Sequence, residues 1–157
     1  MTLSSTDRIE KQILLHASQA RVWRALTDSR EFGLWFRAAL DGPFIPGQRV
    51  TGRITYPGYE HLGMELWVER LEEPTLFSVR WHPHAVDPTV DYSQEPTTLV
   101  EFRLTAVEGG VLLTVTESGF DQLPPERKAL AFRMNAGGWE AQLQNIAQYV
   151  GAHPNDA

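Results

Sequence analysis

The chain has 157 residues, the length of one ordinary domain, and it contains no cysteine. The absence of cysteine excludes disulfides, thiol catalysis and cysteine-ligated zinc or iron–sulfur sites. Twenty acidic against fourteen basic residues give a net charge of −6, which disfavours nucleic acid and anionic membrane surfaces as partners. No apolar run is long enough for a membrane span or a signal peptide. We therefore expect a cytoplasmic protein with no nucleic-acid or membrane partner.

The first third of the chain reads as a strand followed by two short helices. Residues 8–16 mix β-forming residues with alternating charge. Ser18 suits the N-cap of a helix, and Asp28 with Glu31 three residues later has the spacing of a capping box. The expected segments are a strand at 8–16, a helix at 19–26, a second helix running from Asp28 to about Phe36, and a loop at 41–47.

The middle of the chain alternates apolar and polar residues with a period of two, which indicates an antiparallel sheet with one buried face. From Glu126 onward the apolar residues recur every three or four positions, which predicts one long amphipathic helix to about residue 150. The sheet and the helix each have one apolar side, so they must cover each other. The further strands are expected at 49–56, 60–71, 76–82, 98–107 and 111–118.

These segments form one α+β domain with a curved antiparallel sheet of about six strands around the C-terminal helix. We expect a tail at 1–7, the domain at 8–150 and a frayed tail at 151–157.

One hairpin can be paired in advance. Gly109-Gly110 is a strong two-residue turn signal, so Glu108 should pair with Val111 and Phe102 should lie opposite Glu117. This pairing keeps the apolar residues of both strands on one face and places Glu117 at the end of that face.

Four segments together resemble a known family. This order of elements resembles the helix-grip (START-like, SRPBCC) superfamily, and the residues are most similar to homologues of the activator of heat-shock protein ATPase. The resemblance implies a hydrophobic cavity between sheet and long helix. Among such proteins are carriers, receptors, cyclases, dehydratases, a chaperone regulator and many uncharacterised bacterial members, so stress response is one implied role. The matching segments are 17–26 (ASQARVWRAL, with Trp35 following), 63–76 (GMELWVERLEEPTL, running on to Trp81), 109–120, and Gly138-Trp139 with Leu143 and Ile146.

Glu117 is the most informative polar residue. On the core face it would anchor or protonate a ligand; the alternatives are a solvated strand end or a pair with Arg37 or Arg133. With no paired cation, replacing Glu117 by Gln should stabilise the ligand-free protein at neutral pH, because the replacement removes a desolvated charge.

Aromatic and polar side chains near the predicted cavity complete the candidate site. Each aromatic could instead be ordinary core, and Gly137-Gly138 could mark either a kink or close approach of the helix, or tolerated variation. The candidate ligand-binding residues are Trp35, Phe36, Phe44, Met64, Trp81, Phe102, Glu117, Phe120, Asn135 and Trp139. No residue is assigned a catalytic role.

Two further features have competing interpretations. His82 and His84, with Asp87 and Asp91 nearby, could hold a metal, but two such ligands are common by chance, so we expect loop histidines and no metal or other cofactor. Trp67, predicted opposite Arg80 on the outer face, could stack on that arginine or form a dimer contact.

The predicted function is binding of a small hydrophobic or amphipathic molecule by a monomer or homodimer. The alternatives are a cyclase- or dehydratase-like enzyme that uses the cavity carboxylate, and a regulator of a chaperone or stress-response partner. The first needs two converging titratable groups, and the second needs a large exposed apolar patch.

Overall fold

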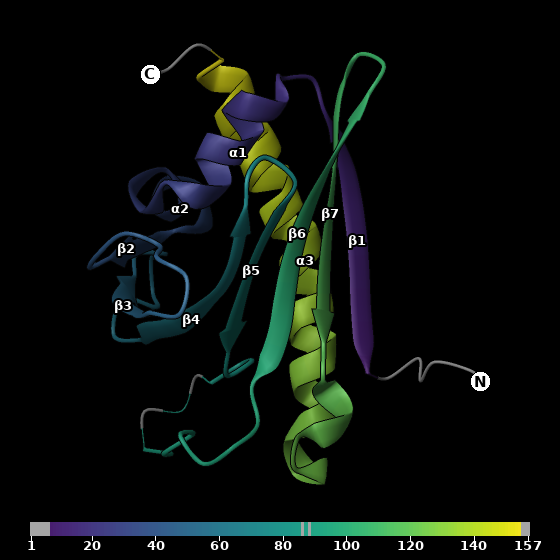
Figure 1. Cartoon of the computed structure of the whole chain (residues 1–157). Helices are drawn as coiled ribbons and strands as arrows, with labels where there is room; N and C mark the ends of the chain where they lie inside the picture. The colour runs from purple at the N-terminus through teal and green to yellow at the C-terminus, as the bar shows by residue number, and fades with distance from the viewer. Residues whose placement is uncertain (1–6, 86, 88, 155–157) are drawn as a thin grey trace, which may run out of the picture.

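The structure, a computed structural model, describes residues 7–85, 87 and 89–154 (Figure 1). The helices and strands follow the predicted order, with one additional short strand. They are β1 (Arg8–Leu15), α1 (Gln19–Thr27), α2 (Ser29–Phe36), β2 (Ala38–Leu40), β3 (Arg49–Ile54), β4 (Gly63–Glu72), β5 (Leu76–Trp81), β6 (Thr98–Val107), β7 (Gly110–Ser118), the 3₁₀ helix η1 (Phe120–Gln122) and α3 (Pro125–Ala152).

The seven strands form one antiparallel sheet in the order β1-β7-β6-β5-β4-β3-β2. The long helix α3 runs along one face of this sheet behind β6 and β7, and α1 and α2 lie beside its C-terminal half (Figure 1). The predicted α+β helix-grip architecture is therefore confirmed. The estimate of about six strands omitted β2, whose three residues are too short to show an alternating pattern. Among the described residues, no helix is both long and apolar enough to cross a membrane.

The hairpin of β6 and β7 has the predicted partners but a register two residues away from the prediction. Val100, not Phe102, lies opposite Glu117, and Phe102 lies opposite Val115. Because the shift is even, both strands keep their apolar residues on the core side, and Glu117 stays on that face.

The wrong register came from assigning both glycines to the turn. The loop is Glu108-Gly109, and of the two glycines only Gly109 has a left-handed backbone, with φ at 85°. Gly110 already belongs to β7, where a Cβ atom would lie 2.1 Å from the carbonyl oxygen of Leu15. Gly110 is thus required by the close approach of β1.

The outer face at β4 and β5 confirms one predicted pair. Trp67 lies opposite Arg80, because a β-bulge after Val68 compensates for a tighter turn than predicted. Trp67 packs edge-to-face on His82 at a ring distance of 5.7 Å, while Arg80 pairs with Glu69. Stacking of Arg80 on Trp67 is not among the cation–π contacts of the described residues.

Helix α3 is continuous through Gly137 and Gly138. A Cβ atom at either glycine would meet nothing within 4 Å. The interpretation of these glycines as a close approach of the helix is therefore wrong. Open space surrounds this part of α3 on the side that the glycines face.

Candidate functional site

The candidate site centres on Glu117, near the end of β7 and on the core face of the sheet. The residue is fully buried, at 0% exposure. Its neighbours across the sheet are Ile9 on β1 and Val100 on β6, both buried. Glu117 is therefore a polar group inserted into an otherwise apolar surface that α3 covers.

Four side chains from three elements, β5, β6 and α3, donate hydrogen bonds to this carboxylate. Trp81 Nε1 at the end of β5 and Thr98 Oγ1 on β6 donate to Oε2, at 2.8 and 2.5 Å. From α3, Trp139 Nε1 donates to Oε1 at 2.8 Å, and Asn135 Nδ2 lies 3.0 and 3.2 Å from the two oxygens. Both carboxylate oxygens are thus saturated by donors.

All four donors are neutral. Within the described part of the chain Glu117 forms no salt bridge, so neither Arg37 nor Arg133 pairs with it, and the solvated alternative also fails. Burying a carboxylate without a cation costs several kcal/mol, and hydrogen bonds to a charged group return about 1.5–3 kcal/mol each. The described hydrogen-bond partners of Glu117 are therefore all neutral dipoles.

Aromatic rings surround the same group. The indoles of Trp81 and Trp139 stack with centroids 5.6 Å apart, and Phe102 meets Trp139 edge-on at 5.6 Å. Phe36, at the end of α2, lies 6.0 Å from Trp81 and 6.4 Å from Trp139. The polar cluster consequently lies within an aromatic surface that joins α2, the sheet and α3.

These side chains contact one another directly. Two hollows of the described surface are lined elsewhere, one between α2 and β2 and one at the start of α3. Neither of these two hollows touches Trp81, Phe102, Glu117 or Trp139. That these four residues line a ligand cavity therefore stays a prediction. Trp81 is only half-buried, so displacement of its ring is the change that would uncover Glu117.

Eight of the ten sequence-predicted site residues belong to this connected cluster, and two lie apart from it. Trp35 and Phe36 contact each other, and Phe44 joins through the ring of Phe77. Phe120 packs on Phe132 near the start of α3 instead. Met64 is buried on β4, with no ring or polar contact to the cluster among the described residues.

Sequence reasoning missed Thr98. With the correct register, Thr98 lies opposite Trp81 and two residues before Val100, on the face of Glu117. Its full burial, at 0% exposure, is unusual for a threonine at a strand start. The alternation of β6 places Thr98 on the buried face, but its position beside Glu117 depends on the register, which the sequence did not predict.

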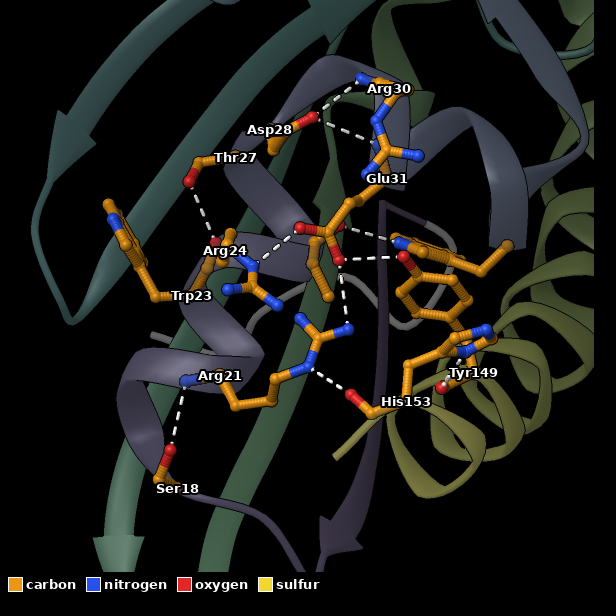
Figure 2. Close-up of polar contacts among 12 residues, drawn as sticks. Ser18, Arg21, Trp23, Arg24, Thr27, Asp28, Arg30, Glu31, Tyr149 and His153 are labelled. Atoms are coloured by element: carbon orange, nitrogen blue, oxygen red, sulfur yellow. Dashed lines mark hydrogen bonds and ion pairs between the residues drawn. The ribbon is translucent and has the colours of Figure 1, made fainter. Parts of the chain in front are cut away.

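A second buried polar cluster lies where α1, α2 and the end of α3 meet (Figure 2). Asp28 caps α2 as predicted, but Glu31 turns away from the cap. Its carboxylate accepts from Arg24 Nε at 2.6 Å and Tyr149 OH at 2.7 Å, and pairs with Arg21 at 2.9 Å. The sequence analysis assigned Glu31 to the helix cap on the basis of its spacing from Asp28, and so did not predict its place in this buried cluster.

The electrostatics of Glu31 follow from these partners. Burial raises the pKa of this carboxyl, but the hydrogen bond from Tyr149, the charge and hydrogen bond of Arg21 and the hydrogen bond of Arg24 outweigh it. The pKa therefore lies below its ordinary value of 4.5. Burial and the hydrogen bond to Glu31 raise the pKa of Tyr149. Because Arg21 also donates to the carbonyl of His153, this cluster fastens the C-terminal end of α3 to both short helices.

The two histidines after β5 lie in different surroundings. His82 packs on Trp67, while the carbonyl groups of Pro83 and His84 accept hydrogen bonds from Arg127 on α3. Burial and the nearby Arg127 lower the pKa of His84. Among the described residues no three histidine or acidic side chains gather in a metal-ligand arrangement.

The contacts of Glu117 also bear on catalysis. A cyclase- or dehydratase-like mechanism needs a second titratable group beside the carboxyl. The four described side chains that hydrogen-bond Glu117 are two indoles, a hydroxyl and an amide, which do not exchange protons in the ordinary pH range.

A curved antiparallel sheet closed over one long helix defines the helix-grip fold of START-like (SRPBCC) proteins. Within this class, the profile of the family described as Activator of Hsp90 ATPase homolog 1-like protein matches residues 16–151. The chain belongs to that family. No curated protein is significantly similar to the sequence.

Solved structures share the fold at low sequence identity. Protein MLL2253 from Mesorhizobium loti is 21% identical with a TM-score of 0.73, covering 96% of this chain and 99% of its own. Ms6760 from Mycobacterium smegmatis is 20% identical with a TM-score of 0.70, covering 91% and 90%. DynU16, from the dynemicin biosynthetic locus, is 21% identical with a TM-score of 0.72 over 94% of this chain, which spans only 48% of DynU16.

Proposed function

We propose that the protein binds a small, largely apolar molecule between the sheet and α3, with Glu117 receiving a hydroxyl or amino group of that molecule. The observation that carries the proposal is a fully buried carboxylate held only by neutral donors and enclosed by aromatic rings. A structural carboxylate is more often held by a cation, as Glu31 is in the same protein.

The arrangement suits exchange of one donor for another. Trp81 and Asn135 are the half-buried members of the cluster, so their bonds are the ones a ligand can replace without unpacking the core. A ligand hydroxyl or ammonium would restore the lost hydrogen bond and occupy the aromatic surface. A ligand carboxylate would meet a like charge in a poorly solvated site and be rejected.

Membership of the family supports the location of the proposed site. Relatives of this fold class commonly hold apolar molecules between sheet and long helix, as the sequence resemblance implied. In this chain that region contains Glu117, Trp139 and Phe102, and displacement of the Trp81 ring would open it. The ligand-binding role of these residues is part of the proposal.

The five tryptophans provide the test, because each gives a separate indole N–H signal in a ¹⁵N-correlated NMR spectrum. Titration with 2-naphthol should shift the signals of Trp81 and Trp139 saturably and leave those of Trp23 and Trp67 unchanged. The matched anion, 2-naphthoate, should leave the first two signals unchanged. The Glu117→Gln protein should lose this discrimination between the two probes.

Two results would contradict the proposal. One is the absence of any saturable shift of the Trp81 and Trp139 signals with 2-naphthol or a comparable aliphatic alcohol such as 1-decanol. The other is equal response to 2-naphthol and 2-naphthoate, which would show that the carboxylate of Glu117 does not select the ligand.

A further inference from the structure

The hollow between α2 and β2 lies outside the proposed interior site and has a volume of about 910 Å³. Its apolar lining includes Leu34, which is 52% exposed, together with Ala39 and Pro43. Volumes of this order accommodate small organic ligands. An exposed leucine in a concave surface provides an apolar contact for one.

The cations at this hollow are unusual for this protein. Of the fourteen lysines and arginines, ten form salt bridges within the described residues, which leaves four: Arg30, Arg37, Arg53 and Arg133. Arg30 and Arg37 line the hollow. Arg53 lies directly opposite Ala39, a lining residue, and so shares its face of the sheet.

Three of these four arginines, which form no ion pair with any described residue, thus lie at or beside one hollow of a chain whose net charge is −6. The acidic residue in the lining is Asp41, and its carboxylate accepts a hydrogen bond from the Thr51 hydroxyl. Among the described residues, the guanidinium groups of Arg30 and Arg37 have no hydrogen-bond or ion-pair partner, so their donors are available.

The backbone at Arg37 adds an independent reason. Arg37 caps the end of α2 with φ at 71° and ψ at 58°, a left-handed conformation that glycine adopts most easily. The turn into β2 is tight, since a Cβ atom on Gly33 would lie 2.2 Å from the carbonyl oxygen of Ala38. An arginine at this strained position is best explained by a use for its side chain.

We propose that this hollow binds a small organic anion, with a phosphate or carboxylate group held by Arg30 and Arg37 and an apolar body resting on Leu34. Guanidinium groups pair with both kinds of anion through two parallel hydrogen bonds. This site has the opposite charge preference to the interior, where Glu117 repels anions. The two sites therefore bind different molecules.

The probe is phenyl phosphate. Inorganic phosphate and phenol are the control ligands, because each carries only the charged or only the apolar part of the probe. Calorimetry should show saturable binding of phenyl phosphate at least about fivefold tighter than inorganic phosphate, because the ring is removed from water. In the NMR spectrum the Leu34 methyl signals should shift, and those of the Trp81 and Trp139 indoles should not. Phenol alone should leave the Leu34 signals unchanged.

Two variants and a control isolate the arginines. Arg30→Gln and Arg37→Gln remove exposed charges without opening the core, and each should weaken phenyl phosphate binding about tenfold. Arg133→Gln removes the fourth unpaired arginine, which lies on α3, and should leave the affinity unchanged.

Three results would overturn the proposal. The first is no saturable binding of phenyl phosphate at millimolar concentration. The second is an equal loss of affinity in the Arg133→Gln protein, which would mean that total charge rather than the hollow attracts the anion. The third is a shift of the Trp81 and Trp139 signals without a shift of Leu34, which would place the anion in the interior.

Discussion

Replacing Glu117 by glutamine keeps the shape of the side chain but puts an NH₂ group where one carboxylate oxygen accepted hydrogen bonds. With the NH₂ at the Oε2 position it faces the indole of Trp81; at the Oε1 position it faces that of Trp139. Thr98 can turn its hydroxyl to accept, and Asn135 can flip its amide. An indole N–H cannot accept, so either orientation leaves one indole without a partner.

The expected loss of stability follows from the indole N–H that is left without an acceptor. A buried donor without an acceptor costs about 1–3 kcal/mol. The remaining hydrogen bonds lose their charge assistance, about 1 kcal/mol each, and this loss is roughly offset by no longer burying a charge. We therefore expect Glu117→Gln to destabilise the ligand-free protein by about 1–3 kcal/mol at pH 7. The four donors thus reverse the stabilisation expected from the sequence alone.

Urea unfolding followed by far-UV circular dichroism measures the difference. The matched control is Glu101→Gln on β6, whose exposed pair with Arg103 has a distance of 3.4 Å and should contribute below about 1 kcal/mol. A Glu117→Gln protein as stable as the native chain, or more stable, would refute the reasoning. It would mean that the indoles find other acceptors.

Three further predictions concern stability, each measured by the same unfolding assay. Gly110→Ala should destabilise by about 1–3 kcal/mol through the clash with the neighbouring carbonyl, whereas Gly63→Ala, whose Cβ would have 3.8 Å of clearance, should cost about 1 kcal/mol or less; equal effects would exclude the close-approach explanation. Gly137→Ala should stabilise by about 0.5–1 kcal/mol, since the added methyl group meets nothing in a continuous helix, and a loss of stability would indicate that the glycine is needed there. Glu31→Gln should cost about 3–5 kcal/mol at pH 7. The folded-state pKa of Glu31 is lowered, so its contribution to the free energy of unfolding is complete above pH 4.5 and is lost as the pH falls through the folded-state value. The native chain should therefore lose stability in acid more steeply than the Glu31→Gln variant. Parallel acid profiles of the two proteins would contradict this.

The sequence predicted the elements that depend on hydrophobic period and local capping. The alternating strands, the amphipathic C-terminal helix and the caps at Ser18 and Asp28 are all present. The strand β2 could not be predicted, because three residues carry no period and form a strand only by pairing with β3. Such an element exists through tertiary contacts alone.

The sequence predicted which face of the sheet Glu117 occupies, because the alternation of residues along the strand fixes that face. Parity placed Glu117 on the core face even though the hairpin register was wrong, because an error of two residues preserves the face. Thr98 and the packing of Trp81 against Trp139 could not be predicted, since they depend on the register and on where α3 crosses the sheet. The turn at Arg37, beside the hollow at α2, could not be predicted either, because arginine rarely adopts the left-handed backbone conformation found there.

The most direct test of ligand binding between sheet and helix is an isotope-filtered nuclear Overhauser spectrum of the protein with saturating 2-naphthol. We predict contacts from the naphthol ring to protons of Trp81, Phe102 and Trp139, with the hydroxyl end nearest Glu117. Contacts confined to Leu34 at the α2 hollow, or to Phe132 at the start of α3, would contradict the central claim that the interior of the fold holds the ligand.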